Sequence, residues 1–298
     1  MITTKKPKVS ICVPVYNNSE LILETVDSIL KQTYTDFEVI LLDDGSTDNG
    51  QTRKTIFSLK DPRIKAFTQE NIGIAGAKNA AVSKSCGEYI AFCDHDDLWE
   101  PNKLEEQMII LEKNSDIDFA YTGYTTFNKK EGRLVTSPKK KDIKEKDQLF
   151  LYAIKNILHN STAILQRKLW DKIGGFDTSY KLSDDLSFHM HVAYYGKGSF
   201  IVNDLVLHRK HPKSSSCSDN ASYTFAIETA NIFEKWFSSK EMSKKERKYA
   251  NKKLARNYYS LAKLSKDDKM EYKKWLFKAW KCRPFYRHYL IALLKNNR

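Results

Sequence analysis

Two apolar segments of this chain each run directly into a group of aspartates, and this arrangement limits the folds that the chain can adopt. Residues 37–42 read Phe-Glu-Val-Ile-Leu-Leu and lead into Asp43 and Asp44. Residues 89–93 read Tyr-Ile-Ala-Phe-Cys and lead into the Asp-His-Asp-Asp run at 94–97. Continuous apolar strands are typical of parallel sheets covered on both faces, where ligands bind beyond the carboxyl ends of the strands. The sequence therefore predicts that these aspartates meet in one crevice.

Carboxylates gathered in this way need a neutralising partner, because like charges repel one another and lose their solvation. A divalent metal ion that carries a phosphorylated ligand is the simplest such partner. Hard oxygen ligands suit Mg²⁺ or Mn²⁺. We therefore expect a metal ion and a phosphorylated ligand at the crevice.

The rest of the sequence up to about residue 220 alternates between strand and helix patterns. Alternation of this kind favours an α/β fold with a right-handed, doubly wound sheet. From residue 221 onward only helical periodicity remains, which predicts three or four packed helices. We therefore expect an α/β domain over 1–220 and a helical domain over 221–298. Strands are expected at 8–15, 37–42, 64–68, 89–94, 118–127, 161–166 and 198–207.

Composition excludes several classes of protein. The chain has 298 residues, of which 41% are hydrophobic, so it is globular rather than disordered. It holds no apolar run near the roughly 18 residues that span a bilayer, and its short basic start has no hydrophobic signal core, so we expect a cytoplasmic protein. The five cysteines form no CxxC pair and are odd in number. This pattern disfavours disulfides and structural zinc.

The net charge of +13 is concentrated at one end of the chain. Residues 240–298 carry nineteen Lys and Arg against five Asp and Glu, whereas the remainder is close to neutral. A basic helical segment with aromatic residues such as Trp275 and Trp280 could lie on an anionic membrane surface. The alternative is that the aromatic side chains form a core and the lysines are solvated. Nucleic-acid binding is not expected, because no nucleic-acid module accompanies the charge.

The order of several short segments resembles the family-2 glycosyltransferases of the glycosyltransferase A fold. The matching segments lie at 9–17, 42–48, 76–80, 87–99, 174–177 and 184–185, so that the resemblance covers roughly residues 8 to 216. It implies a Rossmann-like, mostly parallel sheet, with a nucleotide-binding half at 1–115 and an acceptor and base half at 116–220. It also implies a nucleotide-sugar donor, a divalent metal and inversion at the anomeric carbon. The acceptor would be a glycan or a lipid-diphosphate-linked sugar of a surface polysaccharide, such as a capsule or O-antigen.

The resemblance also assigns the donor site. In the family the position of Asp43 reads uracil, which implies a UDP-sugar. Asp44 would shape the following turn, or together with Asp48 only cap the next helix. Lys78 stands where the family often has Arg and could meet a phosphate, with plain surface solvation as the alternative. The implied nucleotide contacts are Pro14, Tyr16, Asn17, Asp43, Asp44, Lys78, Asp94, His95 and Asp96.

The Asp-His-Asp-Asp run looks like the DxD motif of the family. Asp96 would hold the ion or the ribose hydroxyls, and Asp97 would support it from behind. Arg209 and His211 precede serines at 214–216 and resemble a loop that folds over the diphosphate, with His211 as a further metal ligand. The alternative is an acidic loop that caps the helix starting near Pro101.

The resemblance also implies the catalytic base. A sugar hydroxyl is a poor nucleophile, so an inverting displacement needs a carboxylate base. Aligning residues 184–191 on the family pattern places Asp185 as this base. Asp184 replaces the usual Glu and is kept as its substitute. The alternative is an acidic pair that interacts with the helix dipole.

Two alternatives, the core or the acceptor site, are open for each of Trp99, His189 and His191. Trp99 could form part of the acceptor wall or belong to the core. His189 and His191 point to different sides of a helix, so they cannot bind one ion together and are expected to pack in the core or an acceptor groove.

The leading hypothesis is thus a metal-dependent, inverting hexosyl- or N-acetylhexosaminyl-transferase, in the cytoplasm or at the inner face of the plasma membrane. One rival is a catalytically silent glycan-binding or scaffold subunit of the same fold. The irregular pair at 184–185 suggests this rival.

Overall fold

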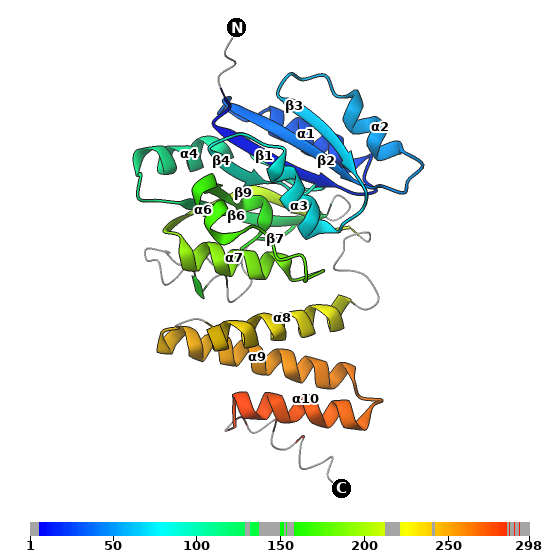
Figure 1. Ribbon diagram of the computed structural model, residues 1–298, viewed down its shortest axis with the longest axis vertical. Helices are drawn as coiled ribbons and strands as arrows, with labels where there is room; N and C mark the ends of the chain where they lie inside the picture. The colour runs from blue at the N-terminus through cyan, green and yellow to red at the C-terminus, as the bar shows by residue number, and fades with distance from the viewer. Residues whose placement is uncertain are drawn as a thin grey trace.

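The computed structural model describes residues 6–128, 132–136, 150–151, 153, 158–211, 221–239, 242–284, 286, 289 and 292. An α/β domain forms one end of the molecule, and helices of the C-terminal segment are stacked below it in the view of Figure 1. The α/β fold class predicted from the alternating pattern is confirmed.

Strands β1 (Val9–Val15), β2 (Phe37–Asp44) and β4 (Tyr89–Phe92) form the centre of the first half of the sheet. β1 lies between the other two and is parallel to both, and every residue of the three strands is buried. Because parallel strands end at the same edge of a sheet, the loops that follow β1, β2 and β4 lie together, as the apolar runs predict. β3 (Ile64–Gln69) extends this half in parallel with β2.

The second half of the sheet is mixed in direction. In the described residues one nine-stranded sheet has the order β3-β2-β1-β4-β8-β6-β9-β5, with β7 beside β6. β8 is antiparallel to β4 and to β6, whereas β6 and β9 are parallel. The expected parallel pairing thus holds for the first half of the sheet and only in part beyond it. The strands of this half are β5 (Leu98–Trp99), β6 (Phe119–Asn128), β7 (Gly132–Thr136), β8 (Ile164–Gln166) and β9 (Gly198–Arg209).

Two strands and one short helix were not predicted. β5 has two residues and pairs with Val206 and Leu207 of β9, so a tertiary contact defines it. The strand expected at 161–166 begins only at Ile164, because Asn160–Thr162 form a 3₁₀ turn. β7 falls in the charge-rich segment 129–147, where the sequence pattern predicts no strand. The rest of that segment lies outside the described residues.

Helices cover both faces of the sheet, and the alternation of side chains along each strand explains why. Val13, Val39 and Ala91 belong to one hydrophobic cluster, whereas Cys12, Ile40 and Phe92 point to the other face and belong to a second. The first cluster contains residues of α1, α2 and α4, and the second contains residues of α3, α6 and α7. These helices are α1 (Leu21–Leu30), α2 (Gln51–Ser58), α3 (Ile74–Ser83), α4 (Lys103–Lys113), α6 (Arg167–Ile173) and α7 (Asp184–Tyr195).

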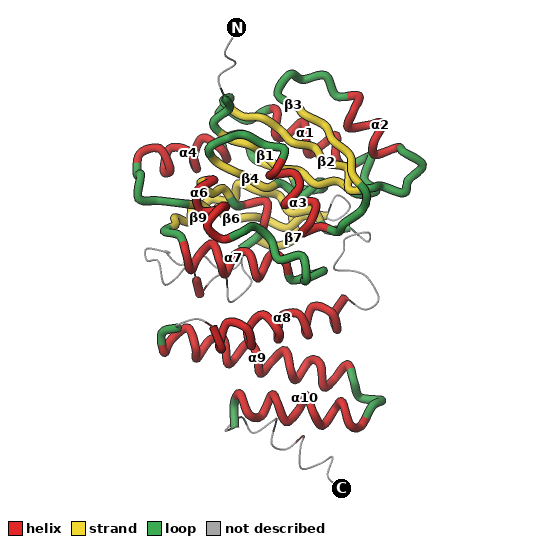
Figure 2. Tube along the Cα trace, in the orientation of Figure 1, coloured by secondary structure: helices red, strands yellow, loops and turns green. Residues whose placement is uncertain are grey.

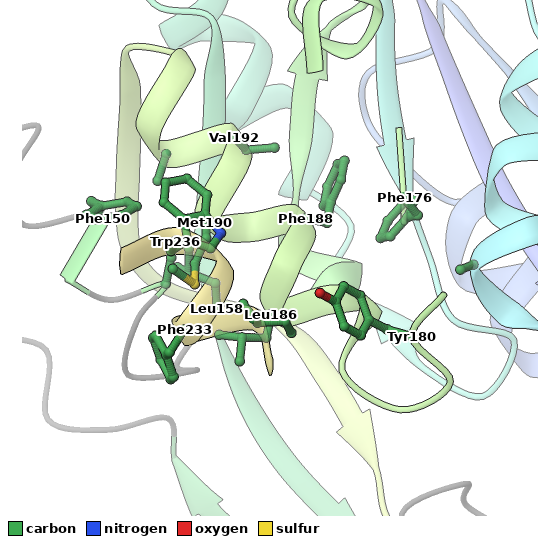
Figure 3. Packing of buried hydrophobic residues seen from close by; sticks show 14 of the residues in the cluster. Phe150, Leu158, Phe176, Tyr180, Leu186, Phe188, Met190, Val192, Phe233 and Trp236 are labelled. Carbon is green, nitrogen blue, oxygen red and sulfur yellow. The ribbon is translucent and has the colours of Figure 1, made fainter. Parts of the chain in front are cut away.

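Helices α8 (Ala221–Ser239), α9 (Lys244–Leu264) and α10 (Lys269–Cys282) form the C-terminal segment, stacked below the sheet in Figure 2. The Trp236 ring of α8 lies 4.9 Å from His191 and 5.3 Å from Tyr194 of α7, measured between ring centroids. Figure 3 shows Trp236 beside Met190, and Phe176 beside Phe188. One hydrophobic cluster therefore continues from the sheet into α10. The domain boundary near residue 220 stays a prediction. None of the described helices is long and apolar enough to cross a bilayer.

Candidate active site

The loops after β1 and β2 are joined by hydrogen bonds. Asn17 has a left-handed backbone (φ 48°), and its N–H donates to Ser46 Oγ at 2.9 Å. Asn17 Oδ1 accepts from the Thr47 N–H at 2.7 Å. Asp43 is buried, and its Oδ1 accepts from the N–H and the hydroxyl of Ser46 at 3.1 and 2.5 Å. Tyr16, which precedes Asn17 in the chain, is 42% exposed. The predicted nucleotide residues Tyr16, Asn17 and Asp43 are thus neighbours along one rim.

Asp44 holds the next loop rather than facing this rim. Its carboxylate accepts from the N–H groups of Ile72 and Gly73, both at 3.1 Å, just before α3 begins. Gly45 has φ +67°, and a Cβ there would lie 2.5 Å from the Asn71 nitrogen, so the turn requires glycine. Asp44 therefore holds the loop that leads into α3, and its predicted parts in the turn after β2 and in nucleotide binding stay predictions. The other alternative, a helix cap, applies to Asp48, which accepts from the Thr52 N–H of α2 at 2.9 Å.

The loop at residues 94–97, which we call the DxD loop for its Asp-His-Asp sequence, is held from its buried side by Asp97. This residue is fully buried, and its carboxylate accepts from Ser161 Oγ at 2.5 Å and from the Arg209 N–H at 3.0 Å. The Nδ1 of His208 lies 3.1 Å from it. Burial raises the pKa of Asp97, but the nearby imidazoles and the hydrogen bonds hold that pKa below its usual value. Ser161 Oγ also accepts from the Asp94 N–H at 3.0 Å, so Asp97 and Ser161 together hold this loop, and the role of Asp97 behind a bound ion stays a prediction.

Arg209 does not have the role that the resemblance implies. Its side chain is 4% exposed, its Nε donates to the Asp96 carbonyl at 2.8 Å, and its guanidinium pairs with Glu24 at 2.8 Å. These contacts direct the guanidinium into the DxD loop and α1, so the expectation that it folds over a diphosphate is corrected. His95 is also tied to the scaffold, with its Nδ1 3.2 Å from the Pro14 carbonyl.

Asp96 and His211, the two predicted metal ligands, lie in contact. His211 Nε2 is 2.8 Å from Asp96 Oδ2, and the two side chains are 19% and 15% exposed. A carboxylate oxygen and an imidazole nitrogen that are both accessible and adjacent form a donor pair that fits Mn²⁺ or Mg²⁺. The serines at 214–216, expected to follow in the same loop, lie outside the described residues.

A second group of ligand atoms lies behind this pair. One atom each from Asp97, His159 and His208 fall within 4.8 Å of one another. The oxygens of Asp97 already accept hydrogen bonds from Ser161 and the Arg209 backbone. We therefore assign this group to support of the DxD loop.

Lys78 lies at the centre of a buried charge cluster. Its ammonium is 2.9 Å from Asp184 and 2.5 Å from Asp185, and its side chain is 3% exposed, so the alternative of surface solvation is wrong. Burial would lower the pKa of Lys78, but Asp184 and Asp185 raise it, and Asp94 of the DxD loop acts in the same direction. The motif at 76–80, the DxD loop and the predicted base therefore belong to one electrostatic unit.

The two acidic residues of α7 differ in burial and in charge. Burial raises the pKa of Asp184 to about 7, and its side chain is 6% exposed. The Asp185 side chain is 33% exposed. Burial raises its pKa, but the charge and hydrogen bond of Lys78, together with other nearby groups, lower it to about 2. Asp185 is thus ionised and partly accessible, as a base must be, whereas Asp184 is enclosed beside Lys78.

Trp99 and His189 belong to the core. Trp99 is 3% exposed within the hydrophobic cluster around α1 and α4, so of the two alternatives for this residue the structure favours the core over the acceptor wall. His189 is buried with its Nδ1 2.7 Å from the Tyr121 hydroxyl, and burial lowers its pKa to about 4. His191 Nδ1 lies 2.7 Å from the Ser187 carbonyl of its own helix. The two imidazoles therefore have separate environments, as their spacing predicts.

Sequence reasoning missed the residues that hold the site from behind. His159, Ser161 and His208 support Asp97, and Glu24 pairs with Arg209. Each is a single polar residue far from the DxD motif in sequence. In the sequence each of them is only a polar residue within or beside an apolar run. Such residues are common and do not by themselves indicate a contact with the site.

The sequence of this chain matches one family of known proteins. The family model described as Glycosyl transferase family 2 matches residues 10–174, which include β1 through α6. The chain therefore belongs to glycosyl transferase family 2, as the order of its motifs indicates.

Two curated relatives and one solved structure illustrate the similarity. Glycosyltransferase RT0329 of Rickettsia typhi is 37% identical over 186 residues, which is 61% of this chain and 57% of that protein. The Escherichia coli UDP-Glc:alpha-D-GlcNAc-diphosphoundecaprenol beta-1,3-glucosyltransferase WfgD is 44% identical over 121 residues, 40% of this chain and 47% of that protein. The chain thus spans about half the length of these relatives.

The structure of S. aureus TarS 1-349 in complex with UDP-GlcNAc has a similar fold. It superposes with a TM-score of 0.73 at 18% identity and covers 92% of this chain and 81% of that one. At this identity the match shows the shared fold alone. It extends well past the family-model match, which ends at residue 174.

Proposed function

We propose that this protein is a metal-dependent, inverting glycosyltransferase that moves one sugar from a UDP-sugar to a glycan or lipid-diphosphate-linked acceptor during surface polysaccharide synthesis. The observation that carries the proposal is the charge cluster in which Lys78 pairs with Asp184 and Asp185 and interacts electrostatically with Asp94 of the DxD loop. WfgD, by its name, transfers glucose from UDP-glucose to a lipid-diphosphate-linked sugar, and TarS binds UDP-GlcNAc. Both support the donor and acceptor classes proposed.

The donor would lie along the rim formed by Tyr16, Asn17 and Asp43. Among the described residues, the one hydrogen bond given to Asp43 Oδ2 is a long one from the Thr68 hydroxyl at 3.4 Å, so this oxygen can also accept from the ring N–H of a pyrimidine. Asp96 and His211 would hold Mn²⁺ or Mg²⁺. When bound there, the ion supplies positive charge that stabilises the departing nucleoside diphosphate.

Asp185 would remove the proton from the acceptor hydroxyl as that oxygen attacks the anomeric carbon. Lys78 keeps Asp185 ionised, and Asp184 holds Lys78 in place from its buried side. The attacking oxygen forms the new glycosidic bond while the bond to the diphosphate breaks, so the configuration inverts.

A catalytically silent donor-binding subunit is the second candidate. The 2.5 Å ion pair between Lys78 and Asp185 favours it, because an engaged carboxylate is a weaker base. Such a subunit would bind the donor without turnover.

Binding of UDP should depend on the metal ion. With UDP and Mn²⁺ at about 100 times Kd, the free energy of unfolding should rise by roughly 2.7 kcal/mol, measured as a higher Tm. Asp96→Asn should remove most of the effect of Mn²⁺ because it removes one ligand. Asp116→Asn, at a 73% exposed side chain in the turn before β6, serves as the matched control. If GDP or dTDP raises Tm and UDP does not, the assignment of Asp43 to uracil is wrong.

We also propose that the C-terminal helices touch the anionic inner face of the plasma membrane from the cytoplasmic side. On α10 the apolar side chains of Met270 and Phe277 are 77% and 46% exposed, beside the exposed Lys274 and Lys281. Each Lys near anionic lipid contributes about 1 kcal/mol. The protein should therefore sediment with vesicles rich in phosphatidylglycerol and not with neutral ones. The double variant Lys274→Glu with Lys281→Glu should bind these vesicles at least tenfold more weakly. Equal sedimentation of the variant and the wild type would contradict the membrane proposal.

A further inference from the structure

Glu228 of α8 holds the segment that leads into the predicted base. Its carboxylate accepts from three consecutive backbone N–H groups, those of Lys181 at 2.7 Å, Leu182 at 3.0 Å and Ser183 at 2.9 Å. Glu228 itself is 8% exposed. Hydrogen bonds to an ionised acceptor are about twice as strong as neutral ones, so this contact fixes the backbone of 181–183.

The fixed segment ends where the acidic pair begins. Ser183 is the N-cap of α7, and its side chain makes no capping hydrogen bond. A carboxylate at the start of a helix also interacts favourably with the helix dipole. Glu228 thus anchors the start of α7 from another helix, and Asp184 and Asp185 follow directly.

The acidic pair is therefore held from two sides. Lys78 of α3 pairs with the carboxylates of Asp184 and Asp185, and Glu228 of α8 fixes the backbone that precedes them. α8 is itself held against α7 by the contact between Trp236 and His191. The position of Asp185 consequently depends on a helix that lies beyond the segment matched by the family model, which ends at residue 174.

We propose that Glu228 is a positioning residue for the base Asp185, through which the C-terminal helices set the geometry of sugar transfer. This inference rests on the proposed function of Asp185. Glu228 touches neither donor nor acceptor in this scheme, and it acts only by fixing residues 181–183.

The test uses Glu228→Gln in the full-length protein. The amide keeps one acceptor oxygen but turns an NH₂ group toward backbone N–H donors, so the three hydrogen bonds cannot all persist. A misplacement of about 1 Å can reduce a rate about 100-fold, so we expect kcat to fall by roughly 10–100-fold. The KM for the donor should stay within about twofold, because Asp43 and the Asp96–His211 pair are not in contact with Glu228. Glu228→Asp, which keeps the charge on a shorter side chain, should recover part of kcat.

Glu234→Gln is the matched control. Glu234 is on the same helix but faces the other way, where it accepts from the Tyr258 hydroxyl and the Lys278 ammonium. We expect this variant to keep the kcat of the wild type. A kcat for Glu228→Gln within twofold of the wild type, or an equal loss in Glu234→Gln, would overturn the proposal.

Amide hydrogen exchange separates this proposal from the proposed function. The amides of residues 181–183 should exchange at least tenfold faster in Glu228→Gln and at the wild-type rate in Glu234→Gln. If the wild type transfers no sugar from any donor, the proposed function fails, while the exchange rates still decide whether Glu228 fixes the segment. Unchanged exchange in Glu228→Gln refutes the positioning role even if kcat falls.

Discussion

Replacing Asp185 with asparagine should reduce kcat by about 10²–10⁴-fold while UDP-sugar still binds with its wild-type Kd. Asparagine has nearly the shape of aspartate but cannot accept the proton of the acceptor hydroxyl. Donor affinity should survive because the donor rim lies at the end of β2 and on the loop after β1, and the Asp96–His211 pair lies on the segments after β4 and β9, so neither is on α7. The measurement is steady-state transfer from UDP-sugars to acceptor sugars, with calorimetric titration of UDP and Mn²⁺.

Asp184→Asn is the informative comparison for this prediction, because it makes the same chemical change one residue earlier. Asp184 is enclosed beside Lys78, whereas Asp185 is partly exposed, so Asp184→Asn should have the smaller effect on kcat. The reverse order of effects would transfer the role of base to Asp184. Full activity in both variants would leave no catalytic role for the acidic pair. Donor binding with no turnover in the wild type would favour the silent subunit instead.

The parts of the site that the sequence predicted are those set by local pattern. The apolar runs at 37–42 and 89–93 specify buried parallel strands, and parallel strands deliver their following loops to one edge. The meeting of Asn17, Asp43 and the DxD loop follows from this rule. The helix that begins at Asp184 likewise begins with acidic residues, which is a common start signal.

The parts that could not be predicted depend on contacts between distant segments. Arginine often binds phosphate, but the Arg209 side chain reaches from β9 to Glu24. The order of the strands in the sheet sets this direction, and no local sequence pattern encodes that order. Most lysines lie on the surface, but Lys78 pairs with Asp184, which is 106 positions further along the chain. Glu228 looks like any polar residue on an amphipathic helix until α8 is placed against α7.

Replacing Lys78 with methionine should lower the free energy of unfolding by roughly 3–5 kcal/mol at pH 8, because removing one partner leaves buried charge without compensation. Asp184 would then lie beside Asp185 with no cation between them. Without Lys78 the pKa of the two carboxyls should rise further in the folded protein. At pH 5 the loss of free energy should therefore be smaller, because a carboxyl that takes up a proton there no longer carries an uncompensated negative charge. Denaturant unfolding at the two pH values measures both effects.

Lys103→Met provides a matched control, because Lys103 is also fully buried but has a different environment. Its ammonium lies 3.8 Å from the centroid of the Trp99 ring and 2.7 Å from Gln107 Oε1, and burial lowers its pKa to about 7. Methionine there should lose only about 1–2 kcal/mol, because it leaves the neutral Gln107 oxygen without a donor but leaves no buried carboxylate without its cation. The double variant Lys78→Met with Asp184→Asn should recover part of the loss seen in Lys78→Met alone, since it removes one of the two uncompensated charges. Equal losses in the two lysine variants, or no recovery in the double variant, would show that volume rather than charge holds the cluster together.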